Sequence, residues 1–238
     1  MDQPIGNSHG ESLDYSYTPG SSEDRPLIVI GHGVTANKDR AWAVELAEGL
    51  AAAGLASLRF SFSGNGESDG DFRESTVTKE VEDLGAVLDT VGPRPIVYVG
   101  HSMGGAVGVL RTSSDPRIVR LISLAGMVHT ATFARRKFGE QVPGKDLMWG
   151  KPECPLSQTF VDDMNNVRSV MPLASRVIVP WLLIHGTADS VVPFQESVEI
   201  REAAGTNAEL VRLEQADHLF TGQEQDVARI VVAWLERD

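Results

Sequence analysis

The ten residues from Ile96 to Gly105 read I-V-Y-V-G-H-S-M-G-G and place Ser102 between an apolar run and a series of small residues. A serine in G-x-S-x-G, at the turn from a strand into a helix, has its hydroxyl pushed out above the sheet, where it can attack a carbonyl carbon. Gly100 and Gly104 leave the room that such a turn needs. The spacing predicts that Ser102 is a nucleophile, and an ordinary glycine-rich turn is the alternative.

Two further side chains that suit this chemistry follow apolar runs downstream. Asp189 ends the segment W-L-L-I-H-G-T-A-D, and His218 ends E-L-V-R-L-E-Q-A-D-H. A serine nucleophile requires an imidazole to take its proton and an acid to orient that imidazole. The neighbouring Asp217 is a weaker candidate for the acid, because adjacent side chains on a turn point in different directions. A turn acid and a surface histidine are the alternatives for Asp189 and His218.

The elements that must position these residues alternate along the chain. Short runs rich in Val, Ile and Leu, typical of strands buried on both faces, are Leu27–Ile30, Ala56–Phe60, Ile96–Val99, Val119–Leu124, Trp181–Ile184 and Leu210–Leu213. Apolar residues recur at helical spacing in Arg40–Ala53, Thr76–Val91, Met103–Ser113, Phe194–Ala204 and Gln223–Glu236. This alternation predicts a mostly parallel central sheet with helices on both faces, and Glu11–Tyr17 is expected to add an antiparallel edge.

In this setting the order Ser102, Asp189, His218 resembles that of the α/β-hydrolase family, in which nucleophile, acid and base follow one another along the chain. The resemblance extends from about Leu27 to Leu235. It implies the α/β-hydrolase fold and a catalytic triad formed by these three residues.

The same resemblance implies an oxyanion hole made of two backbone N–H groups, one after the first strand and one after the nucleophile. In this chain those groups belong to Val34 and Met103. Gly31 and Gly33 are expected to let the first loop approach the nucleophile closely, and His32 is expected to brace it by hydrogen bonding. An ordinary strand–helix turn is the alternative.

About fifty residues between Gly126 and Arg176 contain no segment that we identify as a strand. This length is too great for a plain connection, so we expect residues 127–175 to form a cap inserted into a single domain of residues 1–238. Its side chains Trp149, Phe133 and Phe160 are candidates for substrate binding, and packing the cap onto the body is an equal alternative. From Gly126 to Arg176 the chain has seven Lys and Arg residues and five Asp and Glu residues. This excess of positive charge favours an anionic or phenolic substrate, or else reflects a solvated helix face.

Charge and composition argue against several other classes of protein. A net charge of −12 disfavours a broad surface for nucleic acid. The single cysteine, Cys154, precludes an internal disulfide, and the scattered histidines lack metal-binding spacing, so we expect no metal or cofactor. No apolar run reaches the roughly 20 residues that span a bilayer, and the N-terminus lacks the features of a signal peptide. We therefore expect a cytoplasmic protein.

Five motifs together resemble the small bacterial feruloyl and cinnamoyl esterases: H-G-V-T-A-N-K-D, G-N-G-E-S-D-G-D-F, G-H-S-M-G-G, H-G-T-A-D-S-V-V-P and A-D-H-L-F. The resemblance implies a serine hydrolase that cleaves small-molecule carboxylic esters through an acyl-enzyme, with hydroxycinnamate esters as one candidate class. Val34 departs from the pattern, since a larger apolar residue often stands there. Thioesterases, lipid esterases and acylaminoacyl-type peptidases share the scaffold, and a catalytically silent binding protein is the non-enzyme alternative.

Overall fold

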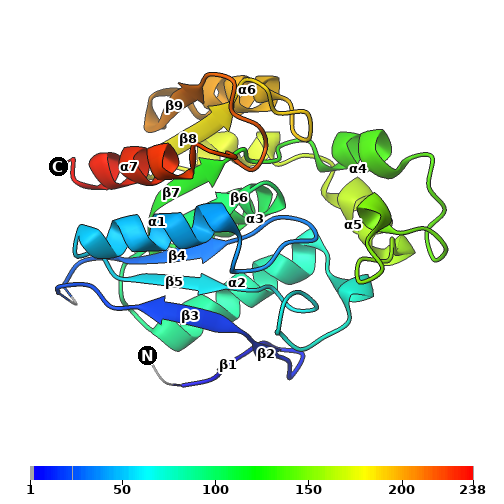
Figure 1. Cartoon of the computed structure of the whole chain (residues 1–238), viewed down its shortest axis with the longest axis horizontal. Coiled ribbons are helices and arrows are strands. Elements are labelled where there is room, and N and C mark those ends of the chain that lie inside the picture. The colour runs from blue at the N-terminus through cyan, green and yellow to red at the C-terminus, as the bar shows by residue number, and fades with distance from the viewer. Residues whose placement is uncertain (1–2, 23, 238) are drawn as a thin grey trace.

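A seven-stranded sheet forms the middle layer of the protein (Figure 1). The computed structural model describes residues 3–22 and 24–237. The sheet has the order β3-β5-β4-β6-β7-β8-β9, and every pair is parallel except β3 with β5. Its strands are β3 (Tyr15–Thr18), β4 (Leu27–Gly31), β5 (Ser57–Phe60), β6 (Ile96–His101), β7 (Ile118–Leu124), β8 (Trp181–Gly186) and β9 (Ala208–Leu213). The predicted mostly parallel sheet is confirmed.

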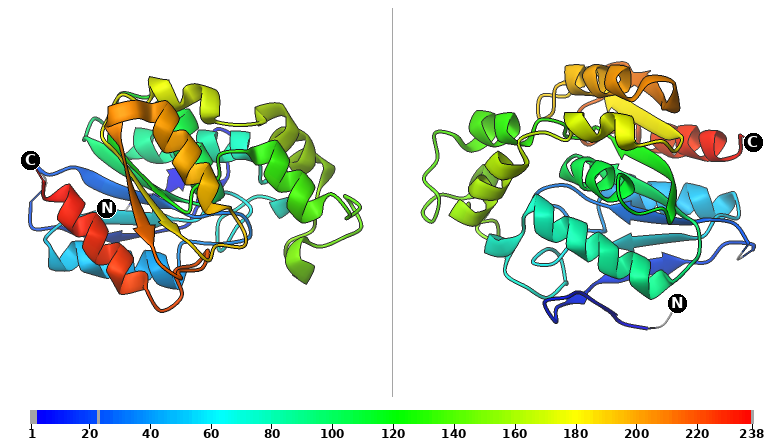
Figure 2. Two further views of the ribbon diagram at one scale, coloured as in Figure 1. Left: turned by 90° about the horizontal axis from the view of Figure 1, so that it is seen from above. Right: turned by 180° about the vertical axis from the view of Figure 1, so that it is seen from behind.

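Helices cover both faces of this sheet, as predicted (Figures 1 and 2). One face carries α1 (Ala41–Ala52) and α7 (Glu224–Leu235), which pack against each other. The other face carries α2 (Val77–Val91), α3 (Met103–Thr112) and α6 (Phe194–Ala204). Side chains of β4 alternate between the two layers, because Ile28 and Ile30 belong to the core under α1 and α7 while Leu27 and Val29 belong to the opposite core.

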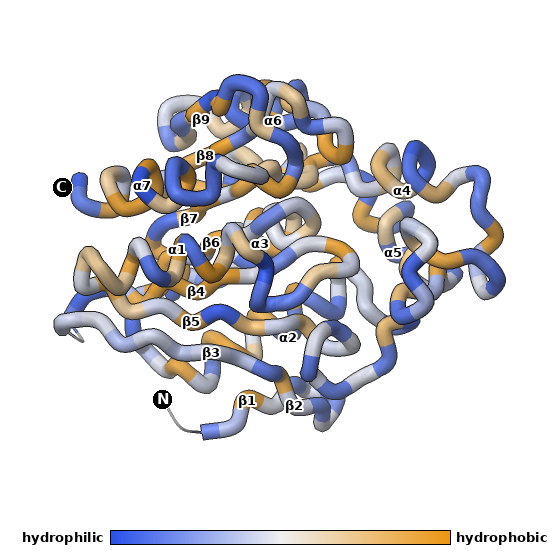
Figure 3. Tube along the Cα trace, viewed as in Figure 1, coloured by the Kyte–Doolittle hydropathy of each residue, from blue (hydrophilic) through white to orange (hydrophobic). Residues whose placement is uncertain are grey.

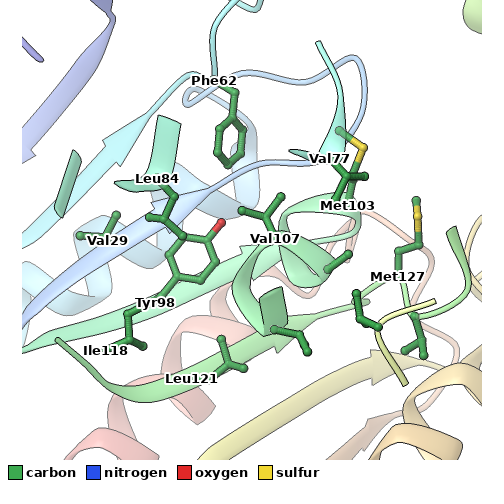
Figure 4. Packing of buried hydrophobic residues seen from close by; sticks show 14 of the residues in the cluster. Val29, Phe62, Val77, Leu84, Tyr98, Met103, Val107, Ile118, Leu121 and Met127 are labelled. Atoms are coloured by element: carbon green, nitrogen blue, oxygen red, sulfur yellow. The ribbon is translucent and has the colours of Figure 1, made fainter. Parts of the chain in front are cut away.

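The inner strands consist largely of hydrophobic residues, which colour much of the tube orange along β4, β6 and β8 in Figure 3. Every residue of β4, β6 and β8 is buried. Figure 4 shows part of the core on the α2–α3 side, where Tyr98 of β6 lies among Val29, Leu84 and Val107. Burial on two faces makes the sheet a rigid support for the loops at its carboxyl edge.

Two strands continue two residues beyond their predicted ends. The predictions ended at Val99 and Ile184, but β6 runs to His101 and β8 runs to Gly186. The extra residues are paired in the ladder, as when His101 lies opposite Leu124. Apolar periodicity cannot detect this extension, because backbone pairing does not depend on the side chain.

The predicted N-terminal edge is divided between two sheets. Tyr15–Thr18 forms β3 and pairs antiparallel with β5, as expected. Ser12–Leu13 instead forms β2, which pairs with β1 (Ile5–Gly6) in a separate two-stranded sheet. The break falls at Asp14, whose carbonyl accepts the N–H of Ser61 beyond the end of β5.

The segment between β7 and β8 contains no strand of the large sheet. It consists of α4 (Thr130–Phe138), α5 (Gln158–Val167) and the short 3-10 turns η2 (Met148–Gly150) and η3 (Met171–Arg176). Elsewhere in the chain, η1 (Phe72–Glu74) and η4 (Gly205–Asn207) are turns of the same kind. Figure 1 shows α4 and α5 beyond the carboxyl edge of the sheet, and α5 packs against α2. The division of the chain into one domain with a cap at residues 127–175 stays a prediction.

Candidate active site

Ser102 lies where β6 ends and α3 begins. Its φ of 54° and ψ of −118° lie outside the regions that L-residues normally occupy, which marks a strained turn. A side chain at Gly100 would collide with the carbonyl of Gly104, so the turn requires glycine there. The N–H of Ser102 donates to the carbonyl of Leu124 at 3.0 Å, and the N–H of Met127 donates to the carbonyl of Ser102 at 2.9 Å. The structure thus has the strand–turn–helix context that G-x-S-x-G predicts.

Asp189 and His218 are joined although 29 residues separate them. Nδ1 of His218 lies 2.7 Å from Oδ2 of Asp189, and an ionised carboxylate can only accept, so Nδ1 carries the proton. The other oxygen of Asp189 accepts the N–H groups of Val191 and Val192 at 2.7 and 2.9 Å. The ring of His218 is thereby fixed with its Nε2 free to accept a proton.

Asp217 takes no part in this arrangement. Its Oδ1 accepts the backbone N–H groups of Leu219 at 3.0 Å and Thr221 at 2.9 Å, which closes the turn after His218. The structure therefore assigns the contact with His218 to Asp189, as the direction of adjacent side chains on a turn predicts.

Ser102 and His218 line one cavity, but the structure does not join them by a hydrogen bond within the described residues. Nucleophile and base often make this bond only when substrate is bound. The structure thus brings the three predicted residues to one place and links the acid with the base.

A second histidine, His185, also contacts Asp189, and the sequence did not predict this contact. Nε2 of His185 lies 3.1 Å from Oδ2 of Asp189 and 3.0 Å from the carbonyl of Val192, and its Nδ1 lies 2.7 Å from Oγ of Ser197. Since the carbonyl can only accept, Nε2 carries the proton and Nδ1 accepts the hydroxyl proton of Ser197. The available signal was the i, i+4 spacing of His185 and Asp189 at the end of a strand.

Asp189 is fully buried and yet ionised. Burial alone would raise the pKa of its carboxyl group, but the hydrogen bonds from His185 and His218 outweigh this effect. The pKa of Asp189 consequently lies well below its usual range. A permanent negative charge at this position can stabilise the imidazolium form of His218.

His101 supports His218 from below. Its Nε2–H donates to the carbonyl of His218 at 2.8 Å. The centroid of its ring lies 4.7 Å from the ring centroid of His218 and 4.9 Å from that of Trp42. Burial, followed by the neighbouring His218, lowers the pKa of His101 to about 3. His101 is therefore a neutral structural group.

The loop after β4 approaches the nucleophile closely. A Cβ atom at Gly33 would lie 2.7 Å from Cβ of Ser102, so only glycine fits. His32 braces the loop as expected: its Nδ1–H donates to the carbonyl of Gly33 at 2.9 Å, and its Nε2 accepts the N–H of Phe62 at 3.0 Å. Burial lowers the pKa of His32 to about 4, which keeps the ring neutral.

The two residues predicted to supply the oxyanion-hole N–H groups are placed differently: Val34 in the loop after β4, and Met103 directly after Ser102. Val34 lines the same cavity as Ser102. Met103 is the first residue of α3, and its side chain is buried in the core (Figure 4). A first-turn N–H has no acceptor within its own helix, and that of Met103 donates to no loop or strand carbonyl of the described residues, so it can bind an oxyanion.

The cavity has a volume of about 170 Å³ and a mostly apolar lining. Phe133 and Trp149 lie in this lining, and Trp149 is 43% exposed. Phe160 does not line it, contrary to the expected substrate contact, because α5 directs its ring into the core against Phe138 at 5.9 Å between centroids. Arg40 and Lys151 also line the cavity and were not predicted as site residues.

Residues 3–22 and 24–237 contain no group of three His, Cys, Asp or Glu side chains that could hold a metal ion. None of the helices in these residues is long and apolar enough to cross a bilayer. Cys154 is buried, and burial raises the pKa of its thiol.

Comparison with known proteins identifies the class to which this fold and site belong. Residues 27–230 match the model of the alpha/beta hydrolase family, and the chain is therefore a member of that family.

Its relatives include the mouse protein named palmitoyl-protein thioesterase ABHD10, mitochondrial, which is 29% identical over 231 residues covering 90% of this chain and 75% of that protein. The structure of Est1E from Butyrivibrio proteoclasticus with bound ferulic acid is similar with a TM-score of 0.88 and 26% identity, over 98% of this chain and 97% of that one. The structure of mouse alpha/beta hydrolase domain-containing protein 10 shares the fold with a TM-score of 0.80 and 23% identity, over 98% and 96% of the two chains.

Proposed function

We propose that this protein is a serine hydrolase that cleaves carboxylic esters, with Ser102 as nucleophile, His218 as base and Asp189 as the acid that orients the base. One observation carries the proposal: the buried carboxylate of Asp189 holds Nδ1–H of His218 at 2.7 Å beside the cavity that Ser102 lines. A fixed imidazole with a free Nε2, lining the same cavity as a serine at a strand–helix turn, suits acyl transfer.

The reaction proceeds in two halves. Oγ of Ser102 attacks the ester carbonyl while Nε2 of His218 takes its proton, and the tetrahedral oxyanion is held by the N–H groups of Val34 and Met103. The carbon–oxygen bond to the alcohol breaks, and the alcohol leaves with the proton from His218. Water, deprotonated by the same Nε2, then attacks the acyl-enzyme; the bond from the acyl carbon to Oγ of Ser102 breaks, His218 returns the proton to Oγ, and the acid leaves.

The cavity favours a small acyl group. A volume of about 170 Å³ lies below the roughly 300–1,000 Å³ of pockets that enclose drug-sized ligands. The apolar lining and the ring of Trp149 suit an aromatic acyl group such as a hydroxycinnamate. The ferulic acid bound to the similar Est1E supports this choice.

Thioester hydrolysis is the second candidate, because the mouse relative is named a palmitoyl-protein thioesterase. The same triad serves both reactions, since only the leaving group differs. A palmitoyl chain would have to extend out of the cavity past Trp149 and Leu219, which are 43% and 42% exposed.

We also propose that residues 127–175 act as a cap over a single catalytic domain, and that the protein works in the cytoplasm on small-molecule substrates.

A panel of substrates tests the proposed function. Wild-type protein is assayed with 4-nitrophenyl acetate, methyl ferulate, palmitoyl thioester and a peptide amide, and Ser102 is titrated with a fluorophosphonate followed by mass spectrometry. We expect ester hydrolysis and a single adduct on Ser102, both lost in Ser102→Ala. Ser114→Ala, which changes an exposed serine shortly after α3, is the matched control and should retain both. A folded protein that neither reacts with the phosphonate nor cleaves any substrate would instead be a binding protein.

A further inference from the structure

Two positive charges occupy the wall of the cavity that contains Ser102. Arg40 directly precedes α1, and Lys151 belongs to the segment between β7 and β8. Among the residues that the structure describes, no Asp or Glu lines the cavity. The Lys, Arg, Asp and Glu residues of this lining are therefore basic ones alone.

Both cations converge on one backbone carbonyl. Nη2 of Arg40 donates to the carbonyl of Thr35 at 3.1 Å, and Nζ of Lys151 donates to the same oxygen at 3.2 Å. Nζ also lies 3.4 Å from Oγ1 of Thr35. Two like charges held this close together repel each other, and a neutral carbonyl does not cancel either charge.

Neither cation has a carboxylate partner in residues 3–22 and 24–237. The ion pairs of these residues leave out both Arg40 and Lys151, although the chain has 33 acidic residues against 21 basic ones. In addition, Nε of Arg40 is buried and makes no hydrogen bond to the described residues. Although the chain has an excess of acidic residues, Arg40 and Lys151 have no ion-pair partner among the described residues, and both line the cavity of Ser102.

We propose that Arg40 and Lys151 form a binding site for an anionic group of the substrate, so that the protein prefers esters bearing a carboxylate. The inference rests on the proposed function, because it assigns a substrate class to the same cavity. A carboxylate placed between the guanidinium and the ammonium group would receive charge-assisted hydrogen bonds from both. Because Arg40 belongs to the body and Lys151 to the residues 127–175, the anion would also bridge these two parts.

Two pairs of esters test whether charge is recognised. The first pair, mono-(4-nitrophenyl) glutarate and 4-nitrophenyl pentanoate, has one leaving group and one acyl length and differs in a terminal carboxylate. The second pair, 3-carboxyphenyl acetate and phenyl acetate, carries the charge on the alcohol side. We expect wild-type kcat/KM to favour the anionic member of at least one pair, and this preference to shrink at high salt. Equal kcat/KM within both pairs overturns the proposal.

Substitution of Lys151 tests which residues recognise the charge. Lys151→Met should lower the ratio of kcat/KM for the preferred anionic ester to kcat/KM for its neutral partner about 10-fold, as for loss of one charge-assisted hydrogen bond. Lys151→Arg should retain most of the preference. Lys145→Met, which removes an exposed lysine of the same segment that does not line the cavity, is the matched control. Equal losses on the anionic and the neutral ester would mean that Lys151 acts on the oxyanion or on the fold, and would overturn the proposal.

The neutral esters keep this inference separate from the proposed function. If 4-nitrophenyl pentanoate is cleaved by wild type and not by Ser102→Ala, the serine hydrolase stands whatever the charge preference. If no ester is cleaved, calorimetric titration with glutarate still decides on the anion site. Saturable binding that is lost in Lys151→Met and kept in Lys145→Met supports the site, and no binding to wild type overturns it.

Discussion

Replacing Asp189 by Asn tests whether Asp189, rather than Asp217, supports His218. The expected losses of stability and rate follow from the hydrogen bonds that Asp189 accepts. One oxygen of Asp189 accepts the imidazole N–H groups of His185 and His218, and the other accepts the N–H groups of Val191 and Val192. An amide has only one acceptor oxygen. In either orientation its NH₂ group therefore faces two donors, and two hydrogen bonds are lost.

These losses affect both stability and rate. Two buried donors without acceptors, at about 1–3 kcal/mol each, should lower the free energy of unfolding by about 2–6 kcal/mol. His218 can escape the conflict by moving its proton to Nε2, but that nitrogen then cannot accept the proton of Ser102. Loss of the productive tautomer lowers kcat by roughly 10⁴-fold in a triad of this kind.

The assay combines urea unfolding with kcat/KM for 4-nitrophenyl acetate, measured where the variant is folded. Asp217→Asn is the matched control, because its side-chain oxygen can still accept the N–H groups of Leu219 and Thr221 as an amide. We expect this control to stay within about 0.5 kcal/mol and near wild-type rate, as for most surface substitutions. Severe loss in Asp217→Asn with a mild effect of Asp189→Asn would refute the reasoning.

Three further outcomes follow from the structure. Gly33→Ala should lower ester turnover at least about 10-fold while the protein stays folded, because the new Cβ would lie 2.7 Å from Cβ of Ser102; a rate equal to wild type would show that the loop is not close to the nucleophile in solution. Trp149→Ala should raise KM for methyl ferulate by the equivalent of about 1–3 kcal/mol and spare 4-nitrophenyl acetate, since only the larger substrate reaches this ring; equal changes for both esters would exclude the contact. Hydrogen bonds from Arg117, with Arg111, outweigh burial and hold the pKa of Asp115 at about 2 against an ordinary 3.8, so its contribution to stability is complete above about pH 4 and is lost as pH falls toward 2; thermal unfolding of wild type and Asp115→Asn should converge over this range, and a constant difference would contradict the assignment.

Much of the fold followed from local pattern. Helix α6 begins and ends at the predicted residues Phe194 and Ala204, and the six strands predicted for the parallel part of the sheet start within about two residues of their predicted positions. Patterns of this kind are readable because a strand buried on both faces must be apolar throughout and a covering helix must be apolar on one side. The serine elbow was equally local, because its glycines and flanking elements are contiguous with Ser102.

The sequence did not reveal several of the side-chain contacts at the site. His185 was considered only as one of the scattered histidines without metal-binding spacing, yet it donates to the same oxygen of Asp189 as His218 does. Phe160 and Trp149 were equal candidates for the cavity, but only Trp149 lines it. Arg40 and Lys151 are 111 residues apart, and their shared contact with Thr35 has no sequence signature.

The sequence by itself determined the alternating α/β architecture, the strand–serine–helix turn and the chain order of Ser102, Asp189 and His218, because each depends on residues close together or on order alone. Only the tertiary structure decided which hydrogen bonds the acid accepts, which aromatic ring lines the cavity and which cations stand unpaired beside the nucleophile. The physical reason is that such contacts depend on the direction in which each side chain leaves its element. That direction is set by the pairing of the strands and the packing of the segment between β7 and β8.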